Sequence, residues 1–129
     1  MLTKALPPLL GVASALLTFG DGVPSVTILA AILASMPVIY LVFGVARRRL
    51  GDPRVLALQL VGLVVFGGLA LASVLVAPDV ARYLLAAGWL GHGVWDLHHH
   101  RADLVVPGAY AHWCAAVDIC GGAAILALA

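Results

Sequence analysis

The sequence predicts an all-α integral membrane protein, a bundle of five membrane-spanning helices that forms one domain over residues 1–129. Hydrophobic residues make up 64% of the chain and charged residues only 10%, and the mean hydropathy is +1.11, which is far more apolar than a soluble domain. The apolar residues also form runs of about 20 residues, the length at which an α-helix crosses a bilayer. Short polar segments separate these runs, so no soluble domain is expected.

Five runs can be taken in order along the chain. The first, Ala5–Phe19, is short, because about 15 residues at about 1.5 Å each do not cover a hydrocarbon layer of roughly 30 Å. We expect a short or tilted helix there. A cleaved signal peptide is the alternative, since Lys4 precedes the run and Ala13-Ser14-Ala15 lies near its end. The four full-length spans are Pro24–Ala46, Pro53–Ala77, Asp79–His100 and Gly108–Ala129.

Acidic residues and prolines mark the helix edges. Asp52 precedes Pro53, and Asp79 follows Pro78. A carboxylate there accepts free backbone N–H groups while proline opens the helix, so both acids are expected to cap helices. Pro37 lies inside the second span and predicts a kink.

The positive charges predict the orientation of the chain. Arg47, Arg48, Arg49 and Arg54 lie between the second and third spans, and such a cluster is typical of the cytoplasmic side of a membrane. With five crossings, the N-terminus and Arg101 also face the cytoplasm and the C-terminus lies outside. Basic residues gathered at one membrane face offer no groove for nucleic acid, so the lipid bilayer is the expected partner.

Two aspartates lie inside the predicted spans. The chain has no glutamate, and Asp96 and Asp118 are the acids that no loop or helix start explains. An ionisable group inside a span costs about 2.5 to 3.5 kcal/mol on insertion scales, which makes it a functional candidate.

The two helices with these acids each carry a polar stripe. His92, Asp96 and His99 follow one another at spacings of four and three residues, which places them within an arc of roughly 60°. The fifth span carries a second stripe of Tyr110, Cys114 and Asp118. The connection between these spans is short, so we expect antiparallel neighbours with His92 level with Asp118 and Asp96 level with Cys114.

This pattern predicts a metal site in the membrane. His92 and His99 lie about 10.5 Å apart along the helix and cannot bind one ion together. The predicted ligands of a single ion are Asp96, His99 and Cys114, while His92 and Asp118 are the predicted catalytic, proton-handling residues.

Other arrangements of the same residues stay open. Gln59 is an alternative ligand to Cys114. A dinuclear site, with one ion near His92 and one near His99, is equally permitted. The donor types suit divalent zinc, iron, manganese or copper. His98, His100 and His112 fall off the stripes, near the membrane interface, where side chains reach water.

The C-terminal part of the chain resembles a family of small bacterial membrane proteins of uncharacterised function. The likeness is carried by Gly88-Trp89, His92, Trp95-Asp96 and His99-His100, followed by Cys114 with Asp118 four residues later. It covers about the last 45 residues, and the connection between His100 and Cys114 is shorter here than in that family. The resemblance implies the bacterial cytoplasmic (inner) membrane and a shared polar site at these histidine, aspartate and cysteine positions. It implies no particular activity.

Several functions fit these observations. The favoured one is a metal-binding membrane protein, with a metal-dependent enzyme that acts on a lipid-soluble small molecule from the bilayer as its more specific form. The alternatives are a small homo-oligomeric transporter of protons or metal ions, and a structural subunit whose His–Asp network only joins helices. The sequence alone does not decide whether the protein is an enzyme.

The arginine cluster makes the topology testable. Reporter fusions or cysteine labelling should place Arg48 in the cytoplasm and Ala129 outside, because five crossings put these positions on opposite sides. A cytoplasmic Ala129 would show that one of the five predicted spans does not cross.

Overall fold

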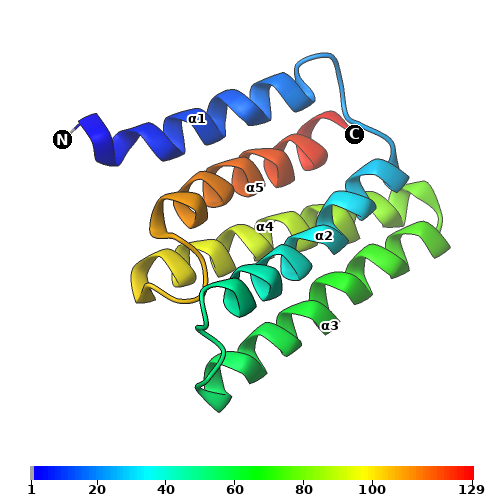
Figure 1. Ribbon diagram of the computed structural model, residues 1–129. Coiled ribbons are helices and arrows are strands. Elements are labelled where there is room, and N and C mark those ends of the chain that lie inside the picture. The colour runs from blue at the N-terminus through cyan, green and yellow to red at the C-terminus, as the bar shows by residue number, and fades with distance from the viewer. Residues whose placement is uncertain (1) are drawn as a thin grey trace.

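The computed structural model describes residues 2–129 and contains five α-helices joined by short connections (Figure 1). They are α1 (Leu2–Phe19), α2 (Val26–Ala46), α3 (Pro53–Leu75), α4 (Pro78–Ala102) and α5 (Gly108–Leu128). No β-strand occurs in this described part of the chain. The predicted all-α helical bundle is confirmed, and most helix ends lie within two residues of the predicted ones.

Three of the helices, α2, α3 and α5, are long and apolar enough to cross a membrane. The first helix is a shorter apolar helix, as expected. The 25 residues of α4 are long enough as well, but this helix carries the polar stripe, and its composition therefore does not mark it as a span. Five crossings remain a prediction.

The polar helix lies in the centre of the bundle. Helix α4 packs against α2, α3 and α5, whereas α1 lies along the outer side of α5 (Figure 1). The expected antiparallel pairing of α4 and α5 is present, and it is the most extensive helix contact in the described structure. Helix α4, the least apolar of the long helices, is thus the one most surrounded by other helices.

The distribution of side chains suits a lipid environment. Large apolar side chains cover the outside, and the exposed fraction is 86% for Leu17, 73% for Val64 and 74% for Leu75. Polar side chains are buried instead, namely Gln59, Ser73, His92, Asp96, His99 and Asp118. Water would favour the opposite arrangement, so this pattern supports placement of the bundle in a membrane.

Most basic residues gather at one end of the bundle. The start of α1, the α2–α3 connection and the α4–α5 connection all lie at this end (Figure 1). Arg47 Nη1 donates to the carbonyl oxygen of Val105 over 2.9 Å, which ties two of these segments together. Lys4 lies beside His100 in a shared surface hollow. The basic loops therefore share one face, as a single topology requires.

One of the two predicted acidic caps is present. Asp52 caps α3, and its carboxylate accepts a hydrogen bond from the backbone N–H of Arg54. The prediction for Asp79 was wrong, because Ala77 is the N-cap of α4 and Asp79 lies inside the first turn. Its charge still faces the positive end of the helix dipole there.

Glycines allow the central helices to approach closely. A Cβ atom on Gly121 of α5 would lie 2.6 Å from Cε3 of Trp89 and 3.0 Å from Cε2 of Phe19. Trp89 is 1% exposed, so its rigid ring has no free space into which to move. A Cβ atom on Gly67 of α3 would meet nothing within 4 Å.

Replacing these two glycines should have different effects on the stability of the protein. Gly121→Ala should lower the stability of the detergent-solubilised protein by about 1 to 3 kcal/mol, because the added methyl overpacks the contact with Trp89. The matched control Gly67→Ala should be neutral or stabilising by up to about 1 kcal/mol, since only backbone freedom changes. Thermal unfolding of both variants tests this, and equal behaviour would contradict the close approach of α4 and α5.

Candidate metal centre

Helix α4 supplies a buried polar stripe. His92, Asp96 and His99 are 1%, 0% and 0% exposed, and they lie on the face of α4 that points into the bundle. Spacings of four and three residues bring them to the same side of the helix, as the sequence predicts.

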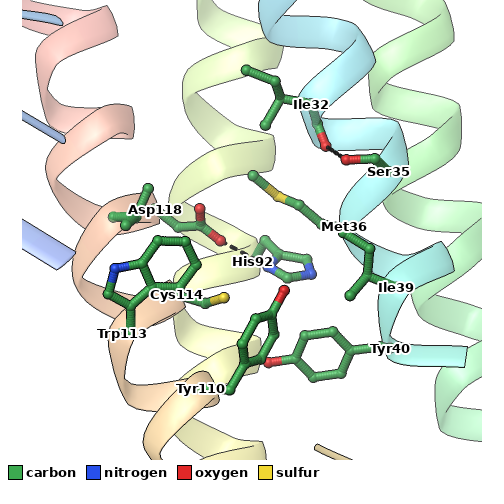
Figure 2. Close-up of a pocket in the computed structure, with 11 residues that line it drawn as sticks. Ile32, Ser35, Met36, Ile39, Tyr40, His92, Tyr110, Trp113, Cys114 and Asp118 are labelled. Carbon is green, nitrogen blue, oxygen red and sulfur yellow. Dashed lines mark hydrogen bonds and ion pairs between the residues drawn. The ribbon is translucent and has the colours of Figure 1, made fainter. Parts of the chain in front are cut away.

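Helix α5 brings a second carboxylate to this stripe. His92 Nδ1 lies 2.8 Å from Oδ2 of Asp118 (Figure 2). The same nitrogen lies 3.3 Å from Oδ1 of Asp96. The level of His92 on α4 therefore does match that of Asp118 on α5. One imidazole nitrogen thus faces two carboxylates in the interior of the bundle.

Helix α2 contributes Tyr40, which the sequence analysis missed. Its hydroxyl group donates a hydrogen bond to Oδ1 of Asp96, and its ring packs edge-on against His92 and His99. Tyr40 is 1% exposed. The available signal was a tyrosine within an apolar span, because a buried phenol needs a hydrogen-bond partner.

His99 is fully engaged elsewhere. Its Nε2 lies 2.9 Å from Nε2 of Gln59, and its Nδ1 lies 2.8 Å from the carbonyl oxygen of Trp95. The amide of Gln59 can only donate through that nitrogen, so His99 Nε2 accepts and Nδ1 donates to the carbonyl. With both ring nitrogens bonded, His99 has none left for an ion.

The structure therefore groups different residues than the predicted set of Asp96, His99 and Cys114. Side-chain ligand atoms of His92, Asp96 and Asp118 all lie within 4.8 Å of one another, and all three residues are buried. Cys114 is half-buried beside this group and does not belong to it. The predicted proton-handling residues, His92 and Asp118, thus lie where ligands would lie.

The remaining histidines lie near the basic end. His98 is exposed, and His100 stacks on His112 with ring centroids 4.5 Å apart. His100 Nδ1 also lies 2.8 Å from the carbonyl oxygen of Gly108. These contacts agree with the expected position outside the stripes.

A cavity of about 150 Å³ adjoins the buried group. It lies between α2 and α5, with α4 behind it, and its wall includes His92 and Asp118 but not Asp96 (Figure 2). Tyr40, Tyr110 and Cys114 also line it. The polar group is thus buried on one side and faces a cavity on the other.

The geometry fits a small divalent cation. Tetrahedral ligands at about 2.1 Å from an ion lie about 3.4 Å from one another, which the 3.3 Å between His92 Nδ1 and Asp96 Oδ1 matches. His92 Nδ1 and Asp118 Oδ2 are hydrogen-bonded at 2.8 Å and would separate slightly around an ion. Oδ2 of Asp96 is buried without a hydrogen-bond partner. One nitrogen and two carboxylate oxygens are a donor set for zinc, iron or manganese, and without the thiolate the argument for copper weakens.

Comparisons with protein-family models, with curated protein sequences and with solved structures find no match to this chain. The function must therefore be argued from the site.

The hydrogen bond from Tyr40 can be tested separately from any ion. Tyr40→Phe leaves the ring in place but removes the donor to Asp96, so the protein should lose about 0.6 to 2 kcal/mol of stability. The control is Tyr83→Phe, because Tyr83 is 59% exposed, and this change should stay within about 0.5 kcal/mol. Equal thermal stability of both variants would show that the Tyr40 hydroxyl is not needed at the site.

Proposed function

We propose that this chain is a multi-pass membrane protein that binds one divalent metal ion through His92, Asp96 and Asp118 and presents it to a lipid-soluble molecule. The observation that carries this proposal is the convergence of one imidazole nitrogen and two carboxylates inside an apolar bundle. We further propose five crossings of a bacterial cytoplasmic membrane, with the N-terminus inside, from the arginine cluster and the family resemblance.

The charge of the site supports an ion. Two buried carboxylates carry more charge than one protonated imidazole at His92 could compensate, and the half-buried Arg47 and Arg82 are bonded to backbone carbonyls elsewhere. Arg47 bonds to Val105, and Arg82 Nη2 donates to the carbonyl oxygen of Leu126 over 2.8 Å. A divalent cation would balance both aspartates while the imidazole stays neutral.

Three protein ligands leave one position of a tetrahedral ion free, as in catalytic zinc sites. Because two ligands, His92 and Asp118, also line the cavity, a molecule in the cavity would reach this free position. The ion would act there as a Lewis acid or activate a water molecule. This supports a metal-dependent enzyme over a purely structural metal.

The proton-relay alternative has less support. A relay needs a polar path to an aqueous surface. In the described part of the chain, the hydrogen bonds of His99 lead to Gln59 and Trp95, and Gln59 is itself 1% exposed. Beyond the metal site, the favoured alternative is a structural hydrogen-bond network.

Elemental analysis of the detergent-purified protein tests the proposal. The wild type should contain about one equivalent of zinc, iron or manganese, and Asp96→Asn and Asp118→Asn should each lose most of it, because an amide is a far weaker metal ligand than a carboxylate. His98→Ala should keep its metal, since this exposed side chain lies outside the site.

His99→Ala separates the two candidate ligand sets. If His92, Asp96 and Asp118 are the ligands, the His99→Ala variant should retain the metal. If Asp96, His99 and Cys114 are the ligands, this variant should lose it. Absence of metal from the wild type after reconstitution with all three ions would reject the metal site and leave the structural network.

A further inference from the structure

The cavity beside the metal centre lies where a molecule can reach it from the bilayer. The backbones of α2 and α5 do not approach each other closely, and the cavity occupies the space between them, although Phe43 of α2 packs against Tyr110 of α5. Two of its lining residues on α2, Ser35 and Ile39, are exposed on the outer surface of the bundle. A molecule from the bilayer would therefore enter beside these two exposed residues.

Its size and walls select a small apolar group. The volume is about 150 Å³. An engineered apolar cavity of about 150 Å³ binds benzene, so one six-membered ring or a short chain end fits. The apolar part of the wall comes from Ile32, Met36, Ile39 and Val117. A larger molecule would keep its remainder in the lipid.

One polar atom of the wall lacks a partner. His92 Nε2 is buried without a hydrogen bond, although the residue lines the cavity. Figure 2 shows Nδ1 linked to Asp118 and the other ring nitrogen turned away from it, toward α2. With an ion on Nδ1, the proton of the neutral ring resides on Nε2, which is then a donor.

We propose that the cavity binds a lipid-soluble carbonyl compound whose oxygen accepts a hydrogen bond from His92 Nε2. This inference rests on the proposed metal site and names the substrate class for it. Because the two ring nitrogens point in different directions, this oxygen lies beside the ring, and another part of the molecule would face the ion.

A matched pair of probes tests the inference on the metal-loaded protein. Cyclohexanone carries the carbonyl group, and methylenecyclohexane has nearly the same shape without an oxygen. Cyclohexanone should bind about 3- to 10-fold more tightly, the effect of one hydrogen bond. The infrared carbonyl band of ¹³C-labelled cyclohexanone should shift to lower frequency on binding, which reports the hydrogen bond directly.

A variant at the mouth shows where the probes bind. Ser35→Phe should weaken the binding of both at least 10-fold, because the ring fills the entrance while the exposed position tolerates it. The control Val38→Phe lies on the outer face of α2 and does not line this cavity, so binding should be unchanged. Both variants should keep the metal.

Metal content and probe binding separate the two claims. Equal affinity for the two probes, an unshifted carbonyl band, or full binding by Ser35→Phe would overturn the carbonyl site while leaving the metal centre in place. Absence of metal from the reconstituted wild type in the elemental analysis would instead reject the proposed function.

Discussion

The arrangement of the whole bundle depends on two carboxylates placed inside an apolar interior. A carboxylate buried in an apolar interior is costly unless it is paired, so the structure must surround Asp96 and Asp118 with compensating partners. His92 lies between the two, and Tyr40 donates to Asp96 from a third helix. The contacts of Asp96 and Asp118 therefore join three helices, α2, α4 and α5. Helix α4 occupies the centre because it carries most of the polar groups.

Close helix packing makes these contacts possible. Gly93, next to His92, faces α5, where an added Cβ atom would lie 2.7 Å from Cγ1 of Ile119 and 3.4 Å from Cβ of Asp118. A larger residue at this position would push α5 outward and carry the Asp118 carboxylate away from His92. The small residues between α4 and α5 thus serve the site as well as the packing.

The sequence predicts the fold well because length and hydropathy define membrane helices, and helical spacing defines which residues share a face. The same spacing placed His92 level with Asp118. It marks Tyr40 only as a tyrosine in an apolar span and not as a partner of Asp96, because periodicity along one helix does not tell which other helix lies opposite. It also could not predict that Gln59 would hydrogen-bond to His99. Whether a histidine nitrogen stays free for an ion depends on partners from other helices, which the spacing along one helix does not give.

The asymmetry of the site gives the strongest argument that it acts on a molecule from the lipid. A network that only joined helices would do best when enclosed on all sides by protein. Here Asp96 is enclosed, with Tyr40 against it, whereas His92 and Asp118 line a cavity between α2 and α5. A buried nitrogen without a partner at that wall has a cost that structure alone does not explain. A ligand entering between α2 and α5 would remove this cost, and the opening lies on the side from which such a ligand would come.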